Sequence, residues 1–236
     1  MFPIIDWRGR VCGFTARKLG EVGNSPKYVN SSESACFKKG ELLYGAHRAF
    51  PMMRRAGIGE LILCEGQMDV LRCHQSGIFR TVATSGTALT QKQAKIIAKN
   101  AESVLLAYDG DVAGRKAIIK AGRLLLAECL PVRVVVLPDG EDPDSIIKEL
   151  GVNAFQELVD KAITLARFQA RWMLSDETRP YSLPVVHKVS RSVMSTIASC
   201  PSSVMRSMML SDLALELKVP LDAVKEDFIN YAKRSV

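Results

Sequence analysis

Short apolar runs, rich in β-branched side chains, alternate with longer segments of helical spacing in the middle of the chain. Such runs predict buried strands, and the alternation predicts a parallel sheet whose strands are joined by right-handed helical crossovers. Beyond residue 151 the apolar positions follow only the 3.6-residue period, which predicts helices. The three apolar runs comprise residues 61–64, 104–107 and 132–137.

Turn and capping signals predict the remaining elements. A polar turn over residues 6–10 separates two β-like pieces, residues 2–5 and 11–14, which predicts a hairpin. Thr90 has the residue type and position of a helix N-cap. We expect a further strand over residues 81–83 and helices over residues 67–76, 90–100, 112–127, 145–150, 154–173, 183–199, 202–217 and 220–231.

A pair of acidic residues follows each of the three apolar runs. Because the carboxyl ends of parallel strands share one edge of a sheet, these carboxylates would converge there. Together they would repel one another, and a hard divalent cation relieves that repulsion. The alternative is that they only cap the helices that follow, which is common for single residues; three clusters favour a Mg²⁺ site. The clusters are Glu65 with Asp69, Asp109 with Asp111, and Asp142 with Asp144.

These acidic clusters resemble the signature of the Toprim domain, which primases, topoisomerases and some nucleases share. The surrounding words SGTALT (85–90), YDGDVAG (108–114) and LPDGEDPD (137–144) resemble bacterial DnaG-type DNA primases specifically. So do MFPI (1–4) and PKYVNS (26–31), which lie upstream of the Toprim unit. The resemblance covers about residues 1–150 in register.

The resemblance implies template-directed synthesis of short RNA primers from NTPs on single-stranded DNA, with Mg²⁺ or Mn²⁺ as cofactor. Glu65, Asp109 and Asp111 would be the catalytic residues. The same three, with Asp69 and the Asp142–Asp144 pair, would be the metal-binding set. A Toprim nuclease or topoisomerase-like enzyme stays an alternative, because enzymes that cleave nucleic acid use the same metal-binding edge of the sheet.

Basic residues in the first region match positions that, in the resembling family, line the groove for the template, the nascent RNA and the nucleotide phosphates. They are Arg17, Lys27 and Lys39, with Asn30 as a polar candidate. Lysine and arginine neutralise phosphates whatever the base, which suits an enzyme that copies any template. Ordinary solvated surface is the competing interpretation for any single lysine.

Three regions follow from the pattern and the resemblance. Residues 1–57 would end a mixed α+β, basic polymerase subdomain, residues 58–151 would form the Toprim parallel-sheet domain, and residues 152–236 a helical subdomain. Neither the zinc-binding domain nor the helicase-binding domain of full-length family members is recognisable, although the replicative helicase is an expected partner of those members. Activity of this chain alone is therefore in question, and a catalytically incomplete nucleic-acid-binding fragment stays a second alternative.

The amino-acid composition limits the kinds of partner and the cellular compartment that we expect for the protein. The net charge is +7 although six acidic residues gather in the three clusters, so the remaining surface is basic enough to attract nucleic acid. Six scattered cysteines, without a Cys-x-x-Cys pair, indicate free thiols, so we expect a cytoplasmic protein with no zinc site. No apolar run could span a bilayer, and we expect no membrane partner.

Overall fold

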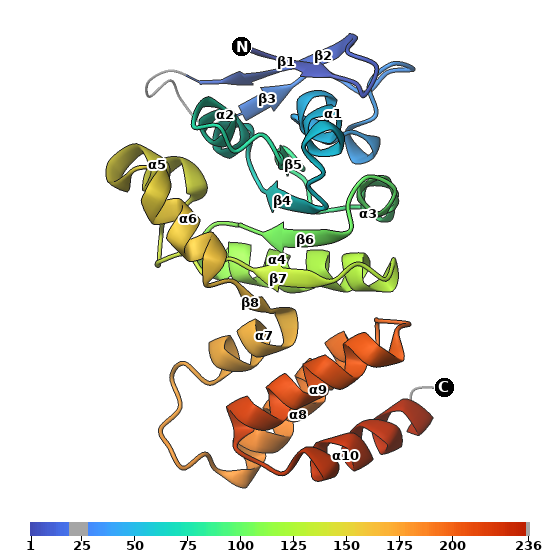
Figure 1. The fold of residues 1–236 in the computed structure, drawn as a ribbon, viewed down its shortest axis with the longest axis vertical. Helices are drawn as coiled ribbons and strands as arrows, with labels where there is room; N and C mark the ends of the chain where they lie inside the picture. Colours follow the sequence, from blue (N-terminus) through green and yellow to red (C-terminus); the bar gives the residue numbers. More distant parts are fainter. Residues whose placement is uncertain (19–27, 235–236) are drawn as a thin grey trace.

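A three-stranded antiparallel sheet opens the chain in the computed structural model, which describes residues 1–18 and 28–234 (Figure 1). Its strands are β1 (Phe2–Ile5), β2 (Val11–Arg17) and β3 (Tyr28–Asn30), in that order. The turn between β1 and β2 is held by Asp6, whose Oδ1 atom accepts hydrogen bonds from the backbone amides of Arg8 and Arg10 at 2.9 Å. The predicted hairpin is confirmed.

A five-stranded sheet with the order β5-β4-β6-β7-β8 forms the centre of the molecule. The first four strands run parallel, and β8 is antiparallel to β7. Side chains alternate across β4, so that Leu61 and Leu63 face one core and Ile62 and Cys64 the other. The strands are β4 (Glu60–Cys64), β5 (Thr81–Ala83), β6 (Ser103–Leu106), β7 (Val132–Val134) and β8 (Ile163–Thr164).

Helices cover both faces of this sheet. One face packs against α1 (Ala46–Ala56), α3 (Gln91–Ala98) and α4 (Val112–Ala127), whose buried residues share a core with Leu61 and Leu63. The other face packs against α2 (Gln67–Gln75), α5 (Pro143–Leu150) and α6 (Val152–Asp160). A short 3-10 helix, η1 (Lys39–Glu41), precedes α1. The predicted α/β architecture is confirmed.

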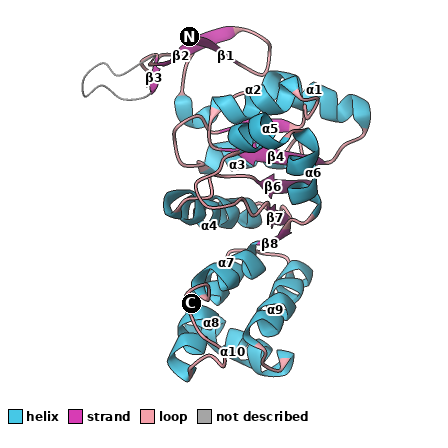
Figure 2. Ribbon diagram, turned by 90° about the vertical axis from the view of Figure 1, so that its left-hand side faces the viewer, coloured by secondary structure: helices cyan, strands magenta, loops and turns pink. Residues whose placement is uncertain are grey.

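Four helices form the end of the molecule opposite the three-stranded sheet (Figure 2). They are α7 (Leu165–Met173), α8 (Leu183–Ile197), α9 (Ser203–Leu217) and α10 (Leu221–Arg234). Buried residues of these helices join the core on the α4 face of the sheet, so this end is packed against the sheet rather than tethered to it. None of the described helices combines the length and the apolar character needed to cross a membrane.

Two expectations about elements were wrong. Residues 154–173 do not form one helix, because α6 ends at Asp160 and residues 163–164 pair with β7 before α7 begins. The region after residue 151 is therefore not purely helical. Helix α1 was not predicted, although its residues Ala46, Ala49, Phe50 and Met53 are buried at helical spacing. The proposed domain boundaries after residues 57 and 151 stay predictions.

Candidate active site at the carboxyl edge of the sheet

Glu65, Asp109 and Asp111 converge at the carboxyl ends of two neighbouring strands. Glu65 directly follows β4, and Asp109 and Asp111 lie in the loop between β6 and α4. Because β4 and β6 are paired in parallel, their ends lie side by side. The negative charges of Asp109 and Asp111 both act on the Glu65 carboxylate. The structure thus brings together the three predicted catalytic residues.

Two glycines allow the loops at this edge to approach closely. A Cβ atom on Gly114, in the first turn of α4, would overlap the Asp109 carbonyl oxygen and would lie 3.0 Å from Glu65 Oε1. A Cβ atom on Gly110 would overlap the carbonyl oxygen of Pro138, and the Gly110 amide donates a hydrogen bond to the Glu141 carbonyl at 2.8 Å. Any larger residue would force these loops apart.

Glu65 is held in an environment that disfavours its own charge. The side chain is half-buried, and its Oε1 atom is buried without a hydrogen-bond partner. Burial raises the pKa of Glu65 to about 7, with further contributions from Asp109 and Asp111, while a backbone hydrogen bond from Asp109 acts in the opposite direction. Carboxylate oxygens are the donor type that hard divalent cations bind, so an unpartnered oxygen beside two further carboxylates suits such an ion in donor type.

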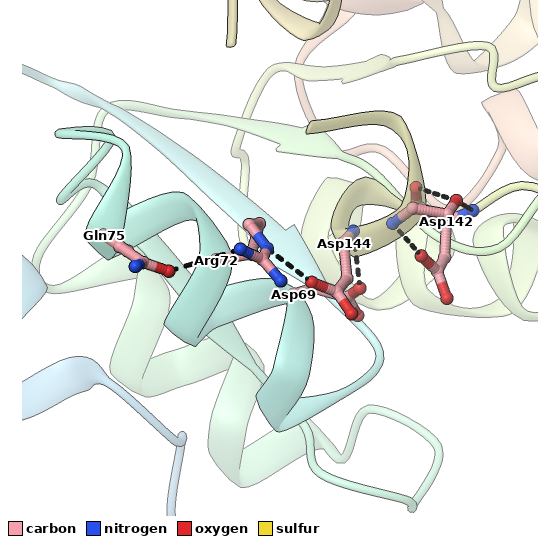
Figure 3. A network of polar contacts seen from close by, with 6 residues as sticks. Asp69, Arg72, Gln75, Asp142 and Asp144 are labelled. Atoms are coloured by element: carbon pink, nitrogen blue, oxygen red, sulfur yellow. Dashed lines mark hydrogen bonds and ion pairs between the residues drawn. The ribbon is translucent and has the colours of Figure 1, made fainter. Parts of the chain in front are cut away.

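Asp69, in the first turn of α2, lies near Asp142 and Asp144, at the start of α5 (Figure 3). Asp69 is buried, and its two oxygens accept hydrogen bonds from the backbone amides of Gly66, at 3.0 Å, and Asp144, at 3.3 Å. Burial raises the pKa of Asp69 to about 8, with a second contribution from the charge of Asp142 and a smaller one from Asp109. The two acidic groups are therefore electrostatically linked through Asp109 and Asp69.

Two of the predicted metal ligands also act as helix caps. Asp111 Oδ1 accepts a hydrogen bond from the Gly114 amide at 2.6 Å, and Asp142 Oδ1 accepts one from the Ser145 amide at 2.7 Å. The capping alternative thus applies to these two residues. Over residues 1–18 and 28–234, no three His, Cys, Asp or Glu side chains form a ready-made metal-ligand set. Metal binding by the six carboxylates stays a prediction.

The predicted basic residues differ in how closely they approach this edge. Lys39 begins η1, and its Nζ atom donates to the Gly86 carbonyl at 3.4 Å, in the loop that follows β5. Asn30 and Lys39 line one small pocket together with Ser85. Arg17 is exposed at the end of β2, opposite Tyr28 in β3. Lys27 lies outside the described residues.

Arg72 and Ser85 belong to the edge but were not predicted as site residues. Arg72 Nε donates to Asp144 Oδ1 at 2.7 Å and so fixes one carboxylate of the second group. Ser85 has a left-handed backbone with φ of 57°, donates its amide to the Glu65 carbonyl at 3.0 Å, and has a buried hydroxyl without a hydrogen-bond partner. The SGTALT segment contains Ser85, but no local pattern links Arg72 to a partner 72 residues away.

Comparison with known proteins identifies the domain first. Residues 62–147 match the family model described as Toprim-like, and residues 1–50 match the N-terminal domain of the DNA primase catalytic core. The parallel sheet with its acidic carboxyl edge is therefore a Toprim-like domain.

Individual relatives cover nearly the whole chain. A DNA primase from Halalkalibacterium halodurans is 36% identical over 228 residues, which cover 96% of this chain and 37% of that protein. The crystal structure of a DNA primase domain from Pseudomonas aeruginosa has a TM-score of 0.80 and 33% identity, covering 96% of this chain and 70% of that one. A DnaG primase catalytic domain bound to ssDNA has a TM-score of 0.77 and 33% identity, covering 93% of this chain and 68% of that one.

The chain belongs to the family of bacterial DnaG-type DNA primases, of whose catalytic core it resembles a part. It spans little more than a third of the length of the curated relative from Halalkalibacterium halodurans.

Proposed function

We propose that this chain provides the metal-binding edge of a DNA primase, which synthesises short RNA primers from NTPs on single-stranded DNA. One observation carries the proposal: Glu65, Asp109 and Asp111 converge at the strand ends, and Glu65 keeps a buried carboxylate oxygen without a partner. Membership in the primase family supports the reaction class.

Glu65, Asp109 and Asp111 would hold Mg²⁺ or Mn²⁺, and Asp69, Asp142 and Asp144 would complete or orient the site. A bound divalent cation neutralises phosphate charge during nucleotidyl transfer. The protein's own contribution is to place the carboxylates: Gly110 and Gly114 permit the close approach of the loops, and Arg72 holds Asp144.

Lys39 and Asn30 would bind the phosphates of template or nucleotide beside this edge, and Arg17 and Lys27 would contribute further positive charge from the first region. A related DnaG catalytic domain binds ssDNA, which supports nucleic acid as the partner. Because lysine and arginine contact phosphates without reading bases, binding here would not depend on sequence.

Primer synthesis on single-stranded DNA with NTPs and Mg²⁺ tests the proposal. The assay is performed with this chain and with a longer protein that adds the zinc-binding and N-terminal polymerase segments typical of the family. We expect metal-dependent RNA products from the longer protein and their loss in its Asp109→Asn variant. Cleavage of the template without RNA synthesis would instead indicate a Toprim nuclease, and neither product would indicate a nucleic-acid-binding protein without catalysis.

Metal binding is measured separately on this chain by calorimetry with Mg²⁺ and Mn²⁺. The matched control is Asp160→Asn, which removes one exposed carboxylate from the end of α6. We expect weaker metal binding for Asp109→Asn and unchanged metal binding for the control. Equal affinity in both variants would contradict the assignment of Asp109 as a ligand.

A further inference from the structure

A large cleft lies between the β1–β2 turn, the segment before η1, and the helices α1 and α3. Its volume is about 770 Å³, and we call it the α1–α3 cleft. Apolar side chains, including Leu42, Phe50 and Ile96, form part of its lining. The rest is strongly cationic, because five basic and two acidic side chains line it among the residues that the structure describes. The basic residues are Lys38, Arg54, Lys92, Lys95 and Lys99.

The lysines of α3 form a row along the cleft. Lys92 and Lys95 lie in α3, and Lys99 is the C-cap residue of this helix, with a helical backbone. Their three- and four-residue spacing places them on one face of the helix, with one turn rising about 5.4 Å. The exposed amino group of Lys92 pairs with the partly exposed Glu41 at 2.7 Å, a surface contact of small energy. The side-chain amino groups of Lys95 and Lys99 form no ion pair or hydrogen bond with any residue that the structure describes.

The two acidic residues of the cleft offset only part of this charge. Asp6 accepts hydrogen bonds from the backbone amides of Arg8 and Arg10 and forms an ion pair with the Arg10 guanidinium at 2.8 Å. Glu41 lies between Lys92 and Lys38, 4.0 Å from the Lys38 Nζ atom. Asp6 is therefore paired with a residue outside the cleft lining, whereas Glu41 offsets part of the charge of Lys38 and Lys92. The excess of positive charge in the cleft comes from Arg54, Lys95 and Lys99.

Trp7 supplies an exposed aromatic surface at the rim of the cleft. It lies at the tip of the β1–β2 turn with 69% of its surface exposed, although large apolar side chains are normally buried. The Arg8 guanidinium lies 4.6 Å from the ring centroid and covers part of the indole. A cationic groove with an adjacent aromatic ring is the combination that binds unpaired nucleotides, because phosphates follow the cations and a base stacks on the ring.

We infer that the α1–α3 cleft is a second binding surface for single-stranded nucleic acid, in which Lys95 and Lys99 contact phosphates and Trp7 stacks on a base. The choice of partner rests on the proposed function, whereas the surface is separate from the acidic edge. The 3-10 helix η1 divides the two: Lys38 lines the cleft, while the next residue, Lys39, contacts the Gly86 carbonyl at the edge. DNA template and RNA product share this chemistry.

Tryptophan fluorescence gives a direct test, because Trp172 is the only other tryptophan in the sequence. In a Trp172→Phe variant, single-stranded oligo(dT) and oligo(rU) are titrated separately. Quenching of Trp7 is expected with at least one of them, and the tighter ligand distinguishes template from product. Trp7→Ala should weaken binding roughly five- to a hundredfold, as expected for the loss of one stacked base. Saturating binding of both oligonucleotides with Trp7 fluorescence unchanged would overturn the inference.

Charge reversal tests the lysine row. Lys95→Glu/Lys99→Glu should lower affinity about tenfold or more and should make the salt dependence shallower by roughly 1.4 in log–log slope, two phosphate contacts on a single strand. The matched control, Lys188→Glu/Lys233→Glu, makes the same charge change on exposed positions of α8 and α10. If both double variants weakened oligonucleotide binding equally, the effect would come from net charge alone. That result would contradict a specific binding surface in the cleft.

A third variant separates this inference from the proposed function. Asp109→Asn alters the acidic edge and should lose metal affinity, but it should keep full quenching of Trp7 by the oligonucleotide. Loss of quenching in Asp109→Asn, with a native melting temperature, would show that binding depends on the acidic edge and would overturn the separate surface. Circular dichroism and thermal melting of every variant establish that the fold is retained.

Discussion

Glu65 shows how one residue can be destabilising by itself and useful to the site. Its carboxylate is half-buried, lacks a partner for one oxygen, and lies beside Asp109 and Asp111. Folding therefore raises its pKa from an ordinary carboxyl value to about 7. The folded protein holds this proton more tightly than the unfolded chain, so stability falls as pH rises between the two pKa values.

Glu65→Gln should remove this share of the pH dependence. Without divalent cations, we expect the unfolding free energy of the wild type to fall between pH 5 and pH 8, with Glu65 contributing on the order of 1–3 kcal/mol after solvent screening. At pH 8 the variant should be more stable than the wild type, and its stability should depend less on pH. Some pH dependence should remain, because burial raises the pKa of Asp69 to about 8. Urea unfolding at several pH values measures this; identical profiles would contradict the prediction.

Asp109→Asn should change both the pKa of the neighbouring Glu65 and the rate of primer synthesis. Because the charge of Asp109 helps to raise the pKa of Glu65, the variant should titrate Glu65 at lower pH, which carboxyl-selective NMR can follow. Primer synthesis by a complete primase carrying this change should fall by at least about a hundredfold, as for the loss of one ligand of a metal clamp. Wild-type synthesis would exclude Asp109 as an essential ligand, and a collapsed melting temperature would leave its chemical role untested.

The sequence predicts the acidic residues of the site better than the side chains that support them. Glu65, Asp109 and Asp111 follow apolar runs, and the shared edge of a parallel sheet brings such positions together. Arg72 and Ser85 depend instead on tertiary contacts, an ion pair across 72 residues and a left-handed backbone. Gln67 likewise lies buried against the N-terminal sheet, where its side-chain amide donates to Thr15 Oγ1 at 3.3 Å. No local sequence pattern predicts these contacts.

At the scale of elements, capping residues and apolar spacing predicted some helix boundaries correctly and others wrongly. Helix α4 covers the predicted residues 112–127, because Asp111 caps its first turn and its apolar spacing is regular. Thr90 is confirmed as the N-cap of α3, with its side chain accepting from the Gln93 amide. Residues 154–173 keep a helical period throughout, yet pairing with β7 interrupts it at residues 163–164. Tertiary pairing overrode propensity there.

Gly122→Ala should destabilise the junction between α4 and α7. A Cβ atom at this position would overlap Leu165 Cδ2 and lie 2.9 Å from Cδ1, so the buried Leu165 would have to move. Overpacking costs about 1–3 kcal/mol, which outweighs the gain in helix propensity of up to about 1 kcal/mol. We expect a lower melting temperature. A double-mutant cycle with Leu165→Ala should show favourable coupling; additive effects would indicate that the two positions do not clash.

Across the whole molecule, β8 and α7 join the C-terminal helices to the central sheet. Residues of β8 pair with Arg133 and Val134 of β7, and the Thr164 side chain donates to Asp212 Oδ2 in α9 at 2.5 Å. Farther along α7, Arg167 and Arg171 both donate to the buried Glu216. β8, which is held to the C-terminal helices through Thr164, therefore covers the edge of β7 that would otherwise be open to solvent.

A fragment of residues 1–162, which keeps α6 but lacks β8 and α7, should consequently self-associate. Removal of β8 leaves the backbone groups of β7 unpaired, and removal of α7 exposes apolar residues of α4, a combination that favours edge-to-edge pairing. Sedimentation or light scattering should detect oligomers at micromolar concentration, whereas a fragment ending after residue 174, which keeps β8 and α7, should associate less. A monomeric 1–162 fragment would contradict the protective role of β8.

The position of β8 in the chain also sets an order of events during synthesis on the ribosome. β7 ends at residue 134, and its antiparallel neighbour ends at residue 164, so thirty residues must be added before that edge can be closed. At typical translation speeds of about 5–20 residues per second, the interval is on the order of 2–6 s. A nascent chain in this interval presents an open strand edge, and synonymous codons that slow elongation between these two points should increase misassembly without altering a single amino acid.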